Sequence, residues 1–329
     1  MAFYSYAFTA NYKRFFTKLK AVAKKENRNF LGLVLDTGWS VFHHGLALTE
    51  YLNYEFYRRN RDERKQYVGV RMQNSFYETV SPSAHKLRYT FKPTFMKEFA
   101  AYTKRDFLVP DGENYEQFLD FLHSREAFMA KPYDGLAGHG VEKIHTKDLE
   151  DPRAYYDFCV KNRIFLEDLV IQHEGMNVLC PASVNTLRIL TFNDHGTPRI
   201  LWMGVRIGNG VNAVDNFHAK GMVCSVNMET GRLEGNAIDK DNVVFDRHPT
   251  TGVVFDGFQI PCFAQIKELV LQAALESDKI LVVGWDVAIS KDGPVIIEGN
   301  RRPGFDIIQV MDGRGRRDIV DSVLGSLEK

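Results

Sequence analysis

The feature that most constrains the fold is a pair of apolar runs near the C-terminus, residues 284–290 and 294–300. The two runs are separated by Lys291, Asp292 and Gly293. Asp-Gly between two apolar runs is a strong short-range signal for a β-hairpin, because both residues tolerate the backbone angles of a tight turn. The sequence therefore predicts two antiparallel strands that close at Asp292-Gly293.

The predicted hairpin gathers oxygen ligands at one end. Asp286 lies near the start of the first strand and Glu298 at the end of the second, and Asn300 follows two residues later on the same face. Carboxylate and amide oxygens are ligands that Mg²⁺ prefers, and a bound Mg²⁺ often bridges to a substrate phosphate. The hairpin is therefore either a metal platform or a surface hairpin with a charged rim.

Composition limits the class of protein. A chain of 329 residues with 44% hydrophobic content is long enough to bury a large core and to form two or three lobes. Lys plus Arg and Asp plus Glu both number 42, so the total charge predicts neither a nucleic-acid partner nor a membrane partner. The four cysteines form no CxxC pair, which argues against a zinc site or a disulfide framework. Without a predicted signal peptide or membrane span, we expect a cytoplasmic protein of undetermined oligomeric state.

Residues 1 to about 125 are expected to be mostly helical. Phe8, Tyr12, Phe15, Phe16 and Leu19 recur at helical spacing in a basic segment, which predicts an amphipathic helix packed on the protein rather than on a membrane. Further helices are expected over residues 39–59, 91–101 and 114–123. No GxGxxG motif follows a predicted strand in this region, so a dinucleotide-binding fold has no support.

From about residue 126 the pattern changes to strand, loop, strand. An apolar strand over residues 127–131 ends in Lys131, and a loop with Gly135, Gly138 and Gly140 follows. Glycines let a backbone approach a ligand closely, and successive exposed N–H groups bind phosphate oxygens. Lys131 places a cation beside the same phosphates. A glycine-rich turn without a ligand is the alternative, and the spacing differs from that of a P-loop.

The next apolar strand, residues 163–173, carries Glu167 and Asp168 in its middle. Acidic residues are disfavoured inside strands, so this break in the pattern predicts a hinge or a functional edge. A helix is expected later, over residues 258–278, before the C-terminal hairpin.

Two arginines are candidates for neutralising phosphate. Arg188 lies in an alternating strand over residues 185–192, and Arg206 lies in the following strand over residues 199–208. Both side chains are expected to line a cleft, although two surface arginines remain an alternative, more so for Arg206. The polar loop over residues 208–221 is long, which favours a binding role.

The order of these parts resembles the ATP-grasp superfamily. The strand-end lysine and glycine-rich loop come first, and the acid-bearing segment Glu167-Asp168-Leu169-Val170 follows. Asn185-Thr186-Leu187-Arg188 comes next, before Asp286 and Glu298-Gly299-Asn300. The helical N-terminus and the segments 181–188 and 215–221 more narrowly resemble the sugar-transfer-associated ATP-grasp group. The resemblance covers residues 85 to 325, approximately.

The resemblance implies an α+β fold in which two lobes grip ATP. With it we expect a helical N-terminal region over residues 1–90, a small lobe with the glycine-rich loop over 91–180, and a large lobe with the metal-binding strand pair over 181–329. Typical ATP-grasp ligases begin with a βαβ lobe that binds the carboxylate. The helical N-terminus departs from that pattern, so the identity of the substrate is not implied.

The resemblance also implies roles for individual residues. The phosphates of ATP are assigned to Lys92, Lys131, Gly135, Gly138, His139 and Gly140. The adenine is assigned to Glu167, Asp168, Leu169 and Val170, and the ribose to Glu174 or Asn177. Mg²⁺ is assigned to Asp286, Glu298 and Asn300, and the transferring phosphoryl group to Arg188 and Arg206.

The implied activity is that of an ATP-dependent ligase. Such an enzyme converts a carboxylate into an acyl phosphate with release of ADP, and an amine or hydroxyl then captures the acyl group. We expect the acceptor to be a small metabolite or a sugar-linked molecule. A small-molecule kinase on the same fold is the second interpretation, and a nucleotide-binding module without turnover is the third.

Overall fold

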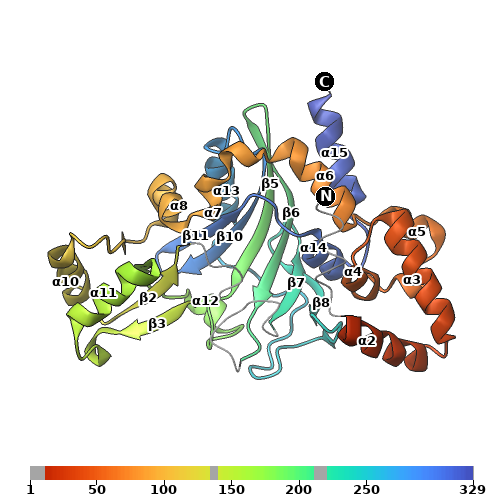
Figure 1. Cartoon of the computed structure of the whole chain (residues 1–329), viewed down its shortest axis with the longest axis horizontal. Helices are drawn as coiled ribbons and strands as arrows, with labels where there is room; N and C mark the ends of the chain where they lie inside the picture. Colours follow the sequence, from red (N-terminus) through yellow and green to blue (C-terminus); the bar gives the residue numbers. More distant parts are fainter. Residues whose placement is uncertain (1–11, 134–139, 211–220, 329) are drawn as a thin grey trace.

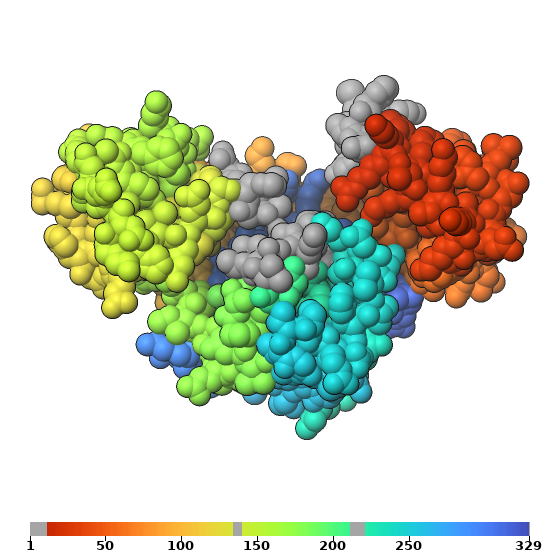
Figure 2. Space-filling view, turned by 90° about the horizontal axis from the view of Figure 1, so that it is seen from below, coloured from red at the N-terminus to blue at the C-terminus, as the bar shows by residue number. Residues whose placement is uncertain are grey.

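Figure 1 shows a computed structural model of the chain, which describes residues 12–133, 140–210 and 221–328. Two antiparallel sheets organise these residues, one with the strand order β1-β4-β2-β3 and one with the order β11-β10-β5-β6-β7-β8-β9. The small sheet and the N-terminal helices lie on opposite sides of the molecule, with the large sheet between them (Figures 1 and 2). The expected α+β class with a helical N-terminal region is confirmed.

The small sheet has its own apolar core. Its strands are β1 (Phe107–Leu108), β2 (Ala127–Pro132), β3 (Glu142–His145) and β4 (Ile164–Asp168). Helices α10 (Tyr115–His123) and α11 (Pro152–Asn162) pack on this sheet, and their Phe118 and Tyr156 share one buried cluster with Phe128 and Leu166 of the strands. The side chain of Asp151 caps α11 by accepting a hydrogen bond from the Ala154 N–H at 3.0 Å.

The large sheet is covered on both faces. Its strands are β5 (Thr186–Asp194), β6 (Thr197–Ile207), β7 (Met222–Val226), β8 (Leu233–Asp239), β9 (Val244–Phe245), β10 (Val282–Ser290) and β11 (Gly293–Asn300). Helices α8 (Lys92–Glu98), α9 (Ala100–Thr103) and α13 (Phe263–Leu275) pack on the face that buries Trp285. On the other face, Leu190 and Phe192 pack against α14 (Phe305–Met311), α15 (Arg317–Leu327) and the N-terminal helices.

The predicted C-terminal hairpin is present, but its turn lies one residue earlier than expected. Ser290 pairs with Gly293, so Lys291 and Asp292 form the turn, and Gly293 has a φ of 114°. Further along the pair, Val287 lies opposite Ile296, whereas Asp286 lies opposite Glu298. The extra residue, Ile297, is a β-bulge that shifts the register by one position. The expected proximity of Asp286 and Glu298 is therefore confirmed.

The N-terminal region consists of short helices. These are α2 (Tyr12–Lys25), α3 (Phe30–His44), α4 (Leu48–Asn53), η1 (Phe56–Arg58), α5 (Arg61–Lys65), α6 (Val70–Val80), η2 (Ser83–His85) and α7 (Leu87–Thr90). The expected continuous helix over residues 39–59 is wrong, because Gly45 ends α3 with a φ of 67°. In the predicted N-terminal helix, Phe15 and Leu19 are buried as expected, but Tyr12 and Phe16 are exposed, and Phe8 lies outside the described residues.

The predicted strand over residues 163–173 is too long. Strand β4 ends at Asp168, and the chain then crosses to the large sheet, where Gln172 pairs with Ser290. Residues 169–171 therefore connect the two sheets. The division of the chain at residues 90 and 180 remains a prediction. None of the helices in the described part of the chain has both the length and the apolar character needed to cross a membrane.

A buried carboxyl in the N-terminal region gives the first testable prediction. Glu50 accepts hydrogen bonds at Oε2 from the Ala47 N–H at 2.7 Å and the Val70 N–H at 3.1 Å. Burial raises the pKa of Glu50 from 4.5 to about 7. The folded protein binds this proton more tightly than the unfolded chain does. The contribution of Glu50 to the free energy of unfolding is therefore fully present below about pH 4.5 and is lost as the pH rises through about 7.

We expect Glu50→Gln to remove this contribution, which is on the order of 3 kcal/mol in the free energy of unfolding. Urea unfolding at about pH 5 and about pH 8 measures it as the difference between the wild-type and variant pH dependences. Glu113→Gln, at an exposed position, is the control and leaves the pH dependence unchanged. An identical pH dependence in Glu50→Gln and the wild type would contradict the assignment.

Candidate functional site

Two arginines and an aspartate meet on one face of the large sheet. Asp286 in β10 is paired with Arg188 in β5, and Arg206 lies one strand further in β6. Arg188 Nε lies 2.6 Å from Asp286 Oδ1, and Arg206 Nη2 lies 2.8 Å from Oδ2. Arg206 is also fixed by Thr186, whose Oγ1 accepts hydrogen bonds from Nε at 3.0 Å and Nη2 at 2.8 Å. The structure thus brings both predicted phosphate-neutralising arginines to one predicted metal ligand.

The carboxyls of Asp286, which is buried, and of Glu298, which is half-buried, form an acidic pair. Burial raises the pKa of Asp286 to about 7, although Arg188 and Arg206 act in the opposite direction. Burial also acts to raise the pKa of Glu298, but hydrogen bonding with Asp286 and the two arginine charges outweigh it and hold that pKa at about 2. Asn300 Nδ2 donates to Glu298 Oε1 at 3.2 Å. The two carboxyls therefore differ in acidity, because Asp286 holds a proton more tightly than a free aspartate and Glu298 ionises more readily than a free glutamate.

This donor set fits a hard cation. Asp286 Oδ1 is buried and has no hydrogen-bond partner among the described residues, although Arg188 lies beside it as an ion pair. A cation held by these oxygens would offset the repulsion between the carboxylates of Asp286 and Glu298. No group of three or more His, Cys, Asp or Glu side chains suited to a metal occurs within residues 12–133, 140–210 and 221–328. The amide oxygen of Asn300 and the oxygens of a bound substrate are therefore needed to complete the coordination.

A second buried ionic cluster lies in the small sheet. Lys131, at the end of β2, forms an ion pair with Glu167 in β4. Arg105 Nη2 lies 3.6 Å from the other carboxylate oxygen of Glu167. Glu167 is 3% exposed, and burial acts to raise its pKa, but the charges of Lys131 and Arg105 outweigh burial and lower it. The negative charge of Glu298 acts in the opposite direction and raises the pKa of Glu167, so the two clusters are electrostatically coupled.

Arg105 connects these two clusters and is the residue that the sequence did not reveal. Besides approaching Glu167, its Nη2 donates to the carbonyl oxygen of Ile297 at 3.4 Å. Ile297 is the bulged residue between Ile296 and Glu298 in β11, so Arg105 links the small sheet to the bulge of the large sheet. Arg105 stands in a short polar stretch between predicted elements, where no periodic pattern distinguishes it from a surface arginine.

The predicted phosphate residues converge only in part within the described chain. The Lys92 N–H donates to the Tyr133 carbonyl at 3.0 Å, and Lys92 Nζ donates to the Pro132 carbonyl at 3.3 Å, so this lysine lies beside the strand end that carries Lys131. Gly140 has a φ of 71°, as expected for a glycine turn. The remaining members of the predicted loop lie outside the described residues: Gly135, Gly138 and His139.

The predicted adenine and ribose residues lie at the connection between the sheets. The carboxylate of Asp168 accepts from Arg125 Nε at 2.8 Å and from the Asp106 N–H at 3.0 Å, so this side chain has a structural role. Leu169 and Val170 follow in the connecting segment. Glu174 is exposed at the start of α12 (Glu174–Asn177), whereas Asn177 accepts from Gln172 at 2.9 Å. Their roles in nucleotide binding remain predictions.

Comparison with known proteins gives one family match and a set of similar structures. The family model described as sugar-transfer associated ATP-grasp matches residues 158–324, just over half of the chain. A comparison with curated proteins finds no match. Several hundred solved chains match in structure.

Three of the similar structures are those of different ligases or synthetases. The ATP-grasp ligase PsnB complexed with its minimal precursor is 16% identical with a TM-score of 0.45, over 75% of this chain and 64% of PsnB. D-alanyl-alanine synthetase A from Vibrio cholerae O1 biovar eltor str. N16961 is 12% identical with a TM-score of 0.43, over 74% of this chain and 66% of that one. The D-cycloserine synthetase DcsG is 12% identical with a TM-score of 0.43, over 77% and 80%. The present chain therefore spans slightly less than two thirds of the length of PsnB.

The contacts of Arg105 give a second prediction. We expect Arg105→Met to lower the free energy of unfolding by about 2–3 kcal/mol, because it leaves Glu167 with one cation and the Ile297 carbonyl without its donor. Arg247→Met is the matched control, since Arg247 is exposed and pairs only with its neighbour Asp246 among the described residues. Urea unfolding of the single variants and of the double variant with Glu167→Gln measures the coupling. Strictly additive effects of the two substitutions would contradict the proposed contact.

Proposed function

The chain belongs to the sugar-transfer-associated ATP-grasp family, and on that premise we propose that it is an ATP-dependent ligase that forms ADP and phosphate. The enzyme joins a carboxylate to an amine or hydroxyl of a small metabolite or a sugar-linked acceptor. The observation that carries the proposal is the convergence of Arg188 and Arg206 on the acidic pair Asp286 and Glu298.

The proposed reaction proceeds in two steps. A carboxylate oxygen attacks the γ-phosphorus of ATP, the bond from that phosphorus to ADP breaks, and an acyl phosphate forms. The amine or hydroxyl then attacks the acyl carbon, the phosphate leaves with the bonding electrons, and the nucleophile loses its proton. Charge on the transferring group spreads over its oxygens, so positioned cations supply most of the catalysis.

We assign a role to each of the site residues from its position. Arg188 and Arg206 neutralise the transferring phosphoryl group, and their pairing with Asp286 holds both guanidinium groups on the same sheet face. Lys131 and Lys92, at the end of β2, bind the phosphates of ATP. Asp286, Glu298 and Asn300 would hold Mg²⁺, which would supply positive charge to offset that of the phosphates.

Three of the four cysteines are buried, which favours a mechanism without a covalent intermediate on a thiol of the protein. Burial raises the pKa of the Cys159 thiol to about 11 and that of Cys224 to about 12, so neither forms a nucleophilic thiolate near neutral pH. Cys180 is buried as well. Activation by ATP requires no side-chain nucleophile.

We assign the two lobes that bind ATP by their residue ranges. Residues 91–180 form the small lobe and residues 181–329 the large lobe, with ATP between them. The helical region over residues 1–90 supplies the acceptor side of the site. In support, the Tyr77 hydroxyl in α6 donates to the Pro303 carbonyl at 2.6 Å, just after the proposed metal ligand Asn300.

An assay with MgATP, hydroxylamine and pooled carboxylates tests the reaction class. Hydroxylamine captures an activated acyl group without the true acceptor, so we expect ADP release together with hydroxamate from one pool. ADP release that depends on an acceptor and gives no hydroxamate would favour the kinase interpretation. Release of AMP and pyrophosphate would contradict the proposed mechanism.

The metal assignment has its own test. We expect Glu298→Gln to lower turnover by at least about 100-fold while the protein stays folded, because a neutral amide binds Mg²⁺ far more weakly than a carboxylate. Glu268→Gln in α13 is the matched control, since Glu268 is exposed and lies on the helix that covers the opposite face of the sheet. ADP release and circular dichroism are measured on both variants. Full activity of Glu298→Gln would remove Glu298 from the metal site.

A further inference from the structure

Helix α3 presents an apolar ridge to solvent. Leu31, Leu35, Trp39 and Phe42 are 66%, 68%, 59% and 79% exposed, respectively. They recur at intervals of four, four and three residues, which places them along one side of the helix. The opposite side carries the buried residues Leu33, Thr37 and Ser40. We call the four exposed residues the α3 ridge.

The α3 ridge has almost no charge near it on its own helix. Asp36 is the only charged residue of α3, and its carboxylate accepts from Arg64 at 2.7 and 2.8 Å and from the Tyr51 hydroxyl at 2.7 Å. This acid is therefore turned toward the body of the protein and neutralised there. A contiguous apolar ridge that is exposed to solvent indicates a site of interaction with a partner.

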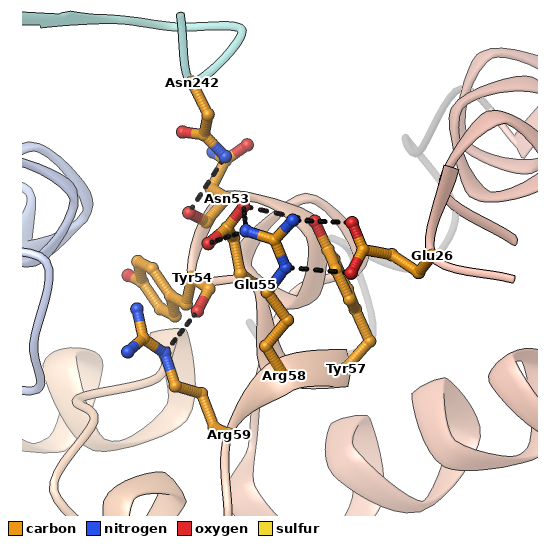
Figure 3. Close-up of polar contacts among 8 residues, drawn as sticks. All are labelled: Glu26, Asn53, Tyr54, Glu55, Tyr57, Arg58, Arg59 and Asn242. Carbon is orange, nitrogen blue, oxygen red and sulfur yellow. Dashed lines mark hydrogen bonds and ion pairs between the residues drawn. The ribbon is translucent and has the colours of Figure 1, made fainter. Parts of the chain in front are cut away.

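The ridge is held in a fixed position by the contacts of its neighbours. At the end of α2, Glu26 accepts from Arg58 at 2.5 and 3.1 Å, and the same guanidinium binds Glu55 (Figure 3). Asn242, from the turn after β8, donates to the Asn53 carbonyl at 3.4 Å in the same region (Figure 3). Lys18 in α2 pairs with Asp241 at 2.8 Å. Helices α2 and α3 are thus anchored both to the α4–η1 segment and to the large sheet.

Helix α2 and its connection to α3 add positive charge beside the ridge. Seven basic residues occur between residues 13 and 28, against one acidic residue, Glu26, which is paired with Arg58. The basic residues are Lys13, Arg14, Lys18, Lys20, Lys24, Lys25 and Arg28. The side of α2 that is buried carries Phe15, Leu19 and Ala23, so most of these cations lie on its solvent side. Both helices occupy the same end of the molecule, drawn in red in Figures 1 and 2.

We propose that this end of the protein binds the surface of a membrane that contains anionic lipids. The α3 ridge inserts into the boundary between headgroups and acyl chains, where Trp and other large apolar side chains are favoured. The lysines and arginines of α2 lie over the anionic headgroups. With 15 residues, α3 is too short to span a bilayer and lies in its plane.

The charge distribution favours a lipid surface over a second copy of the chain. Two copies joined through the ridges bring two basic α2 helices close together, and their repulsion opposes that dimer. An anionic surface attracts the same charges. The balanced total charge of the chain conceals this local excess, which explains why composition alone predicts no membrane partner.

Vesicle flotation of the full chain tests the proposal. We expect binding to phosphatidylcholine vesicles that contain about 30% phosphatidylglycerol, and at least about 10-fold weaker binding to pure phosphatidylcholine. Trp39→Ser with Phe42→Ser is expected to weaken binding to the anionic vesicles at least about 10-fold. The matched control is Phe158→Ser, at an apolar position 51% exposed on α11, which leaves binding unchanged. Lys24→Glu with Lys25→Glu weakens binding, whereas Lys161→Glu does not.

Tryptophan fluorescence reports the same event at the ridge. Of the three tryptophans, Trp202 and Trp285 are 3% and 0% exposed, so Trp39 is the one that solvent reaches. We expect a blue shift of emission with anionic vesicles and its loss in Trp39→Phe. Retention of the full shift in Trp39→Phe would place the membrane contact elsewhere and overturn the assignment.

Two results would overturn the proposal as a whole. The first is the absence of binding to anionic vesicles by a folded chain. The second is a dimer, detected by light scattering, that Trp39→Ser with Phe42→Ser dissociates and anionic vesicles do not. That outcome would identify the α3 ridge as a self-association surface. The proposal is independent of the ligase assignment, because none of the substituted residues belongs to the ATP site.

Discussion

The β-bulge at Ile297 determines which side chains meet at the centre of the molecule. The turn fixes Val287 opposite Ile296, and a regular ladder continued from there would place Asp286 opposite Ile297. Glu298 would then move to the other face of the sheet, because successive side chains alternate. The bulge instead aligns the two carboxyls, and the Arg105 donor to the Ile297 carbonyl stabilises it from the small sheet. Every proposed role of the acidic pair therefore depends on one inserted residue.

Buried charge is the main cost that the site imposes on the fold. Asp286 and Glu167 are 1% and 3% exposed, and each acid is neutralised by two cations that come from neighbouring strands or from a preceding loop. Buried ion pairs of this kind contribute little net stability, since desolvation offsets much of the attraction. Their presence is better explained by a charged substrate that joins the cluster. A nucleotide with its metal ion meets that description and supports the proposed ligase chemistry.

The N-terminal helices have a buried side and a solvent-exposed side. Their buried side, with residues such as Phe15 and Leu19, belongs to the core that also includes residues of the large sheet, and α6 contacts the segment after Asn300. Their outer side carries the α3 ridge and the basic face of α2. None of the residues of the α3 ridge or of the basic face of α2 belongs to the proposed site on the large sheet. The chemistry and the location of the protein are thus assigned to separate parts of one chain.

Local patterns in the sequence determined the strand pair, the lysine at the end of β2 and the strands that carry Arg188 and Arg206, because periodicity and turn residues act over short distances. They also indicated a mostly helical N-terminus, but not the break at Gly45. The bulge at Ile297, the contacts of Arg105 and the exposure of α3 could not be read in this way. Each depends on which distant segments pack together, and an apolar helix face has the same pattern whether a core covers it or not. Only the tertiary structure decided that Leu33 is buried while Leu31 and Trp39 face solvent.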